Sequence, residues 1–256
     1  MKQPFSAGTT PVEDHALYWE RHGSPRVGTL TLLHHGLGSV RSWRRQIPAL
    51  VAAGWEVLVY DRWGYGRSDP RPDFSQRFLL DDASEAIHLL DLLDIDHTAL
   101  IGHSDGGTIA LLMATMQPQR ITRMVVVAAH IYYEEKMRDG LLSIAEQTRQ
   151  PPLSIALQRE HGERAEALVE LWINHWLNSD PSRLDMSDRL EQIACPTLVI
   201  QGELDEHATP DHARDIAEGV QRGELWLIPE TGHMPPHEIP DKFNQRVLDF
   251  LTQQRV

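Results

Sequence analysis

Short apolar runs separated by helical patterns dominate the chain. The runs are rich in Leu, Val and Ile and do not alternate cleanly with polar residues, a pattern typical of parallel strands buried on both faces. They cover residues 29–36, 55–62, 98–104, 123–130, 196–203 and 224–230. Residues 81–94 and 240–251 repeat apolar residues at steps of three and four, which predicts helices that cover a sheet. The pattern therefore predicts an α/β fold with a mainly parallel sheet.

The regular rhythm breaks after His130. Residues 131–194 contain no convincing strand, and their four helical segments are separated by Pro, Gly and Asp, which end helices. A loop of this length without structure of its own would be unusual in a compact domain. We therefore expect a helical cap at 131–194 that lies over a site on a core made of residues 1–130 and 195–256.

The stretch Gly102-His103-Ser104-Asp105-Gly106 follows one of the predicted strands and precedes a helical pattern. In a sharp strand-to-helix turn, a serine between glycines presents its hydroxyl above the sheet edge, next to free N–H groups of the helix N-terminus. The alternative is a serine that only caps the helix in a glycine-rich turn, including a turn that binds phosphate. A lone serine is a weak nucleophile, so catalysis needs a base and an acid further along the chain.

Candidates for both follow two later predicted strands. Asp205 comes just after the strand within 196–203, and His233 comes just after the strand within 224–230. Both are therefore expected at the carboxyl ends of strands, where open α/β sheets bind ligands. The order serine, aspartate, histidine is the one that a serine at such a turn requires.

Five stretches in order resemble the α/β-hydrolase superfamily: HHGLGSVRSWRRQIPAL, YDRWGYGRSD, GHSDGG, GELDEHATP and GHMPPHE. The resemblance covers nearly the whole chain and implies an eight-stranded, mainly parallel sheet flanked by helices, with the helical cap inserted after the sixth strand. It also implies that Ser104 is the nucleophile, His233 the general base and then general acid, and Asp205 the residue that orients the imidazole. Nearby rival acids are Glu203, Glu206 and Asp211.

The resemblance also places an oxyanion hole. The stretch His35-Gly36-Leu37-Gly38 is similar to the family's oxyanion loop, so the backbone N–H groups of Leu37 and Asp105 are the expected donors. An ordinary turn at a strand end is the alternative for this loop. YDRWGYGRSD is interpreted as a structural turn without a chemical role.

Asp105 and two tryptophans allow both structural and binding roles. An acid in the first turn of a helix is favoured by the helix dipole, which is a sufficient reason for Asp105. It could instead attract a substrate ammonium, since a family member acting on amino-acid esters also has Ser-Asp-Gly-Gly here. Trp172 and Trp176 lie four apart on a predicted helix, where they pack the cap onto the core or line a pocket for aromatic groups. The candidate substrate contacts are His35, His103, Trp172 and Trp176.

Metal and nucleotide sites are not predicted. The chain has 14 histidines but neither an H-E-x-x-H motif nor a Cys/His cluster. His34 and His35 fit strand ends, and His207 and His212 fit exposed helix positions. The glycine-rich stretches form neither G-x-G-x-x-G nor a P-loop, so no cofactor is expected.

Composition limits the partners and the setting. A formal charge of −13 argues against nucleic acid or an anionic membrane as the main partner. The single cysteine, Cys195, cannot form an internal disulfide, and neither a signal peptide nor a run of about 18 apolar residues appears. We expect a cytoplasmic protein whose partner is a small molecule; the sequence does not indicate an oligomeric state.

The sequence thus predicts a serine hydrolase that cleaves a small carboxylic ester, lactone, thioester or amide through an acyl-enzyme, without a cofactor. The same fold and residues also serve carbon-carbon bond hydrolases, cofactor-free oxygenases and perhydrolases. A non-catalytic receptor for a small molecule is an alternative of a different class.

Overall fold

The computed structural model describes residues 6–178, 180 and 185–253, and within them eight strands form one sheet. The strand order is β1-β2-β4-β3-β5-β6-β7-β8. The strands are β1 (Ser6–Val12), β2 (His15–His22), β3 (Gly28–Leu33), β4 (Trp55–Tyr60), β5 (Thr98–His103), β6 (Ile121–Val127), β7 (Thr197–Gly202) and β8 (Gly223–Ile228). β1, β2 and β4 pair antiparallel, and the remaining pairs are parallel. The predicted eight-stranded, mainly parallel sheet of an α/β-hydrolase fold is confirmed.

The parallel strands and the N-terminal hairpin differ in their burial. Every residue of β4, β5 and β7 is buried, as expected for strands covered on both faces. In β1, by contrast, partly buried and exposed residues alternate up to the buried Val12 at its end. This edge strand therefore lacks the continuous apolar run by which the six parallel strands were predicted.

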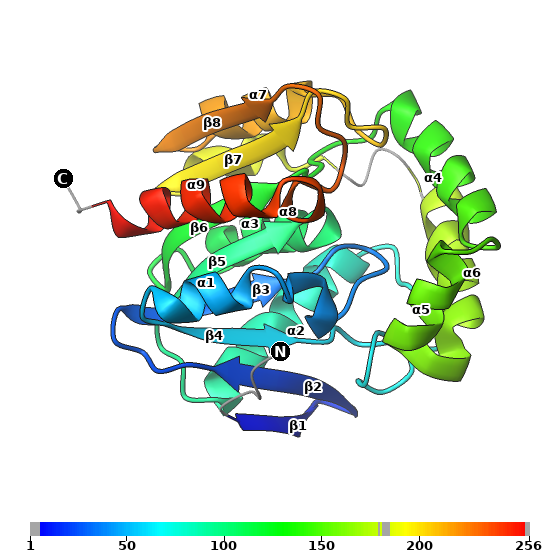
Figure 1. Ribbon diagram of the computed structural model, residues 1–256, viewed down its shortest axis with the longest axis horizontal. Helices are drawn as coiled ribbons and strands as arrows, with labels where there is room; N and C mark the ends of the chain where they lie inside the picture. Colours follow the sequence, from blue (N-terminus) through cyan, green and yellow to red (C-terminus); the bar gives the residue numbers. More distant parts are fainter. Residues whose placement is uncertain (1–5, 179, 181–184, 254–256) are drawn as a thin grey trace.

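Helices cover both faces of the sheet (Figure 1). α2 (Phe78–Leu92), α3 (Asp105–Met116) and α7 (Asp211–Gly219) contribute buried residues to one core cluster. α1 (Ile47–Ala52) and α9 (Pro240–Thr252) contribute to the cluster on the other face. The predicted helices 81–94 and 240–251 correspond to α2 and α9. A short helix, α8 (Pro235–Glu238), precedes α9.

Helices also fill the described part of the chain between β6 and β7. They are α4 (Glu135–Gln147), α5 (Leu153–His161) and α6 (Ala165–Asn178), which we call the cap helices, followed by a 3₁₀ helix at Ser187–Gln192. The cap helices lie together to the right in Figure 1, beyond the ends toward which the parallel strands point. Part of the last predicted cap segment, 181–184, lies outside the described residues, and the domain boundaries 131 and 194 stay predictions.

Candidate active site

Ser104 lies in the sharp turn between β5 and α3. Its backbone has φ 55° and ψ −121°, a conformation that residues other than glycine rarely adopt. The flanking glycines permit the turn, because a Cβ on Gly102 would lie 2.1 Å from the Gly106 carbonyl oxygen and one on Gly106 would lie 2.3 Å from the Leu33 carbonyl oxygen. The Ser104 amide donates to the Val127 carbonyl at 2.8 Å. The backbone at Ser104 is therefore fixed on both sides of the turn.

The Ser104 hydroxyl faces His233, and His233 faces Asp205. Ser104 Oγ lies 3.0 Å from His233 Nε2, and His233 Nδ1 lies 2.9 Å from Asp205 Oδ2. Asp205 is completely buried, and the other two residues are only 8% exposed. Ser104 Oγ makes no capping bond to α3, so the interpretation of Ser104 as a simple helix cap is not supported. The arrangement is the one in which an imidazole can deprotonate a serine.

The loop after β7 fixes the Asp205 carboxylate. Oδ1 accepts hydrogen bonds from the amides of His207 at 2.8 Å and Ala208 at 3.2 Å, and Gln201 Nε2 donates to Oδ2 at 3.3 Å. These bonds orient the carboxylate toward the His233 ring. Of the rival acids, Glu203 and Asp211 have exposed side chains.

The third rival acid, Glu206, holds the backbone around His233. Its Oε2 accepts from the His233 amide at 3.1 Å, while Glu238 accepts from the two neighbouring amides at 2.9 Å each. On the other side, His103 Nε2 lies 2.8 Å from the His233 carbonyl, to which it donates. His103 is thus buried and its ring serves this backbone bond, so these contacts do not support its predicted role as a substrate contact.

The surroundings of Asp205 and His233 shift the pKa values of both side chains in opposite directions. Burial raises the pKa of Asp205, but the neighbouring His233 and the hydrogen bonds to the carboxylate outweigh it and lower that pKa to about 2. Burial by itself lowers the pKa of His233, yet the Asp205 carboxylate together with Glu206 and Asp105 outweighs burial, and the pKa lies above the ordinary value of 6.5. Asp205 therefore stays ionised near neutral pH and favours the protonated form of the His233 imidazole.

This shift predicts the pH dependence of activity. The base form of His233 is neutral, so kcat/KM should rise with pH and reach half its maximum above pH 6.5. The Glu206 charge also raises the pKa of His233, so Glu206→Gln should move the midpoint to lower pH while keeping an oxygen for the His233 amide. Glu203→Gln, which removes an exposed charge from the same loop, serves as the control. A midpoint unmoved by Glu206→Gln would contradict this assignment.

The loop after β3 places Leu37 in the cavity that Ser104 also lines. Leu37, Asp105 and Ser104 line one cavity, which we call the Ser104 cavity. Gly36 is required here, because a Cβ would lie 2.4 Å from Cζ2 of Trp172 in α6. The Gly36 position therefore lets an indole from the cap pack directly on the candidate oxyanion loop.

The turn after β4 supports that loop from beneath. Arg62 is 1% exposed; its guanidinium donates to the His35 carbonyl at 3.1 Å and to the Asp82 carboxylate at 2.8 Å. Its amide donates to His34 Nε2 at 3.1 Å. YDRWGYGRSD thus has a structural role, as predicted, but sequence reasoning missed that it positions the candidate oxyanion loop. The signal was hidden because Asp82, the partner of Arg62, lies on a distant helix.

The Ser104 cavity has a volume of about 240 Å³ and is mainly apolar. The cap helices contribute the side chains of Met137, Leu141, Ile144, Gln147, Leu153, Trp172 and Trp176. Of the predicted substrate contacts, His35, Trp172 and Trp176 line the cavity. The titratable lining residues His130, Glu206 and His207 were not among the predicted substrate contacts. His130 follows β6, so its place at the carboxyl end of a parallel strand was the available signal.

The Asp105 carboxylate is 1% exposed and faces groups of the protein itself. Oδ2 accepts from Trp172 Nε1 at 3.0 Å and lies 3.7 Å from the Arg62 guanidinium, while Oδ1 lies 3.7 Å from His130 Nε2. Burial raises the pKa of Asp105, and Arg62 opposes that shift. These contacts favour a structural role, in which Asp105 connects the cap helix α6 to the turn between β5 and α3, over capture of a substrate ammonium.

Two histidines differ from their predicted surroundings. His212 is completely buried, not exposed; its Nδ1 accepts from the Ile131 amide at 3.3 Å, and its ring stacks on Tyr132 at 4.1 Å. The exposed position was predicted from the helix alone, whereas the residues entering the cap cover this face. His207, the other histidine predicted at an exposed helix position, lies in the loop before α7 and lines the Ser104 cavity. His34 follows β3, at the strand end predicted for it, and is completely buried. Within the described residues, no group of three or more His, Cys, Asp or Glu side chains is placed to hold a metal ion.

Comparison with known proteins places the chain in a family. Residues 29–160 match the family described as alpha/beta hydrolase fold. The mouse serine hydrolase BPHL is 30% identical over 246 residues, which cover 92% of this chain and 82% of the relative. A 2-hydroxy-6-oxononadienedioate/2-hydroxy-6-oxononatrienedioate hydrolase of Paraburkholderia xenovorans is 28% identical and covers 88% and 86%.

A solved structure shows the same fold. The 2-hydroxy-6-oxo-6-phenylhexa-2,4-dienoate hydrolase of Rhodococcus sp. strain RHA1 superposes with a TM-score of 0.82 over 97% of this chain and 99% of that one, at 16% identity. The relatives of the present chain include both serine hydrolases and carbon-carbon bond hydrolases. The sequence match over more than half of the chain and the shared fold establish that this chain belongs to the α/β-hydrolase family.

Proposed function

We propose that this α/β hydrolase is a serine hydrolase that cleaves a small carboxylic ester, lactone or thioester through an acyl-enzyme. The observation that carries the proposal is the chain of contacts from Ser104 Oγ to His233 Nε2 at 3.0 Å and from His233 Nδ1 to Asp205 at 2.9 Å. Ser104, at one end of this series of contacts, lines a small cavity. No cofactor takes part in this chemistry.

The reaction proceeds in two halves. Ser104 Oγ attacks the carbonyl carbon while His233 Nε2 takes its proton, and the carbonyl oxygen gains negative charge toward the amides of Leu37 and Asp105. His233 then donates the proton to the leaving alcohol or thiol, which departs and leaves the acyl group on Ser104. Water then attacks this ester as it gives a proton to His233, and the bond to Ser104 Oγ breaks as His233 returns that proton to the oxygen, which releases the acid product. Asp205 holds the imidazole with Nε2 toward the serine throughout.

The cavity supports a small substrate without negative charge. Its described lining contains the carboxylates of Asp105 and Glu206 but neither Lys nor Arg. Burial lowers the pKa of His35 well below its ordinary value, and burial with the neighbouring His233 lowers the pKa of His207 to about 4. Both rings are therefore neutral near pH 7, which leaves His233, the proposed base, as the lining side chain that can carry positive charge.

Carbon-carbon bond hydrolysis is the second candidate, favoured by the relative from Paraburkholderia xenovorans. The name of that relative's substrate denotes a dicarboxylate. Cationic groups in the pocket favour a substrate with two carboxylates, and the described lining of the Ser104 cavity contains neither Lys nor Arg. We therefore prefer a neutral or cationic ester, lactone or thioester.

The setting and partner follow from the same proposal. We propose a small-molecule substrate and a cytoplasmic protein whose only cysteine, Cys195, is a buried residue with a pKa raised by its burial. In the part of the chain that the structure describes, no helix combines the length and apolarity that crossing a membrane requires.

A pre-steady-state assay tests the function. With p-nitrophenyl acetate and butyrate, we expect a burst of about one p-nitrophenolate per protein chain, because acylation releases the alcohol before the acyl-enzyme is hydrolysed. A fluorophosphonate probe should label the protein with the same stoichiometry and suppress the burst. Absence of both burst and labelling would overturn the proposal, whereas turnover of a vinylogous 1,5-diketone without ester turnover would favour carbon-carbon bond cleavage.

A further inference from the structure

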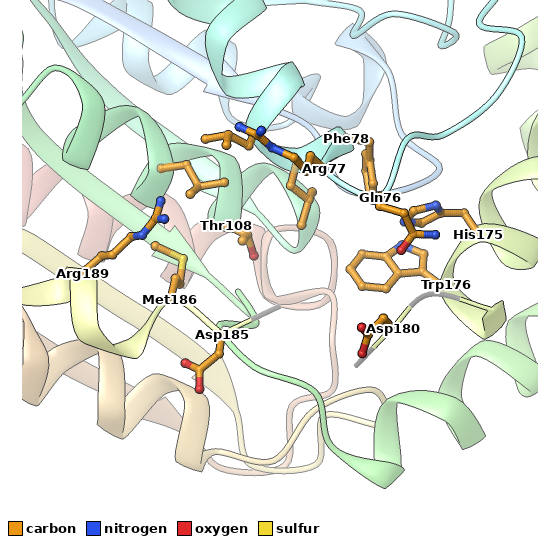
Figure 2. A pocket seen from close by; sticks show the side chains of 13 residues that line it. Gln76, Arg77, Phe78, Thr108, His175, Trp176, Asp180, Asp185, Met186 and Arg189 are labelled. Atoms are coloured by element: carbon orange, nitrogen blue, oxygen red, sulfur yellow. The ribbon is translucent and has the colours of Figure 1, made fainter. Parts of the chain in front are cut away.

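A second cavity lies next to the Ser104 cavity. It has a volume of about 550 Å³ and lies between the start of α2, one side of α3, the end of α6 and the residues before the 3₁₀ helix. Its apolar lining comprises Phe78, Leu79, Leu80, Leu112, Trp176 and Met186. In Figure 2, Trp176 and Phe78 lie on one side of this space and Met186 and Arg189 on the other. Charged side chains, including Arg77 and Arg189, also border the cavity.

Among the described residues, Trp176 is the one that lines both cavities. Its ring meets Trp172 at 6.4 Å and His130 at 5.1 Å between centroids, and both of these residues line the Ser104 cavity. It also meets Phe78 at 5.6 Å and His175 at 5.8 Å, and both of these line the second cavity. The Trp176 indole therefore lies between the Ser104 cavity and the second cavity.

Helix α3 shows how close the two cavities are. Asp105 lines the Ser104 cavity, and Thr108, three residues later on α3, lines the second cavity. Three residues make nearly one helical turn, so the second cavity begins about 5 Å farther along the helix. Within the described residues, Trp176 Nε1 is buried without a hydrogen-bond partner. Packing alone thus holds this indole between the cavities.

We propose that Trp176 determines substrate size by closing the Ser104 cavity against an apolar second cavity. In this position it restricts the enzyme to substrates with a short acyl or alcohol group. Without the indole, the joined space would accept a longer alkyl or arylalkyl group, whose end would lie among Phe78, Leu112 and Met186. This inference rests on the proposed ester hydrolysis.

Trp176→Ala tests the inference with two substrate series. One series is p-nitrophenyl esters from acetate to octanoate, and the other is alkyl acetates from ethyl to octyl, followed by pH-stat titration. The measured quantity is kcat/KM for the longest member divided by that for the shortest. We expect Trp176→Ala to raise this ratio at least about tenfold in one series, since each methylene placed in an apolar pocket contributes up to that order of discrimination.

Two further variants make the result specific. Ile173→Ala removes a buried residue of the same helix that lines neither cavity, so the ratio should stay at the wild-type value. Leu112→Trp, added to Trp176→Ala, refills the second cavity and should return the ratio toward wild type. A ratio that Trp176→Ala leaves unchanged in both series, in a variant that still hydrolyses acetate, would overturn the inference. Failure of the wild type to hydrolyse any ester would instead overturn the proposed function. If Trp176→Ala does not fold, Trp176→Leu provides the same measurement with less loss of packing.

Discussion

Ser104→Ala is expected to lower kcat for p-nitrophenyl acetate by about 10⁴- to 10⁶-fold, as loss of the nucleophile does in serine hydrolases. The physical reason is that the attacking oxygen, 3.0 Å from His233 Nε2, is removed and no acyl-enzyme can form. The burst and the fluorophosphonate label should both disappear. Circular dichroism and the melting temperature should stay close to wild type, because the deleted hydroxyl makes no capping bond to α3.

A matched serine controls for the loss of a hydroxyl elsewhere. Ser84 lies in α2, where its exposed Oγ donates to the Leu80 carbonyl at 3.0 Å. Ser84→Ala should therefore retain wild-type burst amplitude and turnover. Retained turnover in folded Ser104→Ala would rule out Ser104 as the nucleophile.

Asp205→Asn should lower kcat by about 10⁴-fold, an effect nearly as large, although the nucleophile remains. The Asn amide group can donate to His233 Nδ1, so the ring would carry its proton on Nε2 and could no longer accept one from Ser104. Loss of the buried charge also removes the largest of the contributions that raise the pKa of His233. The acid limb of the residual activity should accordingly move to lower pH.

The neighbouring carboxylate supplies the control for Asp205. Glu203 is exposed on the same loop, so Glu203→Gln should keep activity within about twofold, as expected for a surface change away from the site. Nuclear magnetic resonance of the imidazole proton, seen between His233 and Asp205 in the wild type, should lose its downfield signal in Asp205→Asn. A loss of activity in Glu203→Gln as large as that in Asp205→Asn would show that the choice of acid is wrong.

Local sequence patterns predicted the parallel strands and the candidate Ser-His-Asp residues because both depend on position along a strand. Continuous apolar runs mark β3 to β8, and Ser104, Asp205 and His233 each follow the carboxyl end of one run. The hairpin of β1 and β2 was not located by such a run, since an antiparallel edge keeps one side in water and its apolar residues are interrupted.

What the patterns missed depends on contacts between distant segments. His103 was assigned to substrate, but its partner is the His233 carbonyl 130 positions along the chain. His212 was placed at an exposed helix position, but Tyr132, from the start of the cap, covers it. The support that Arg62 gives to the candidate oxyanion loop needs Asp82 on α2. No local pattern contains both members of these pairs.

The packing of Trp172 on Gly36 has a consequence for engineering this enzyme. Its indole comes from α6, yet it rests on the loop that carries Leu37 and donates to Asp105, the residue after Ser104. A cap transplanted from another hydrolase to change substrate range would therefore also replace a side chain that supports the candidate oxyanion loop. Such chimaeras should keep a tryptophan at position 172, or pair its replacement with a redesigned loop at Gly36, so that specificity and reactivity can be varied separately.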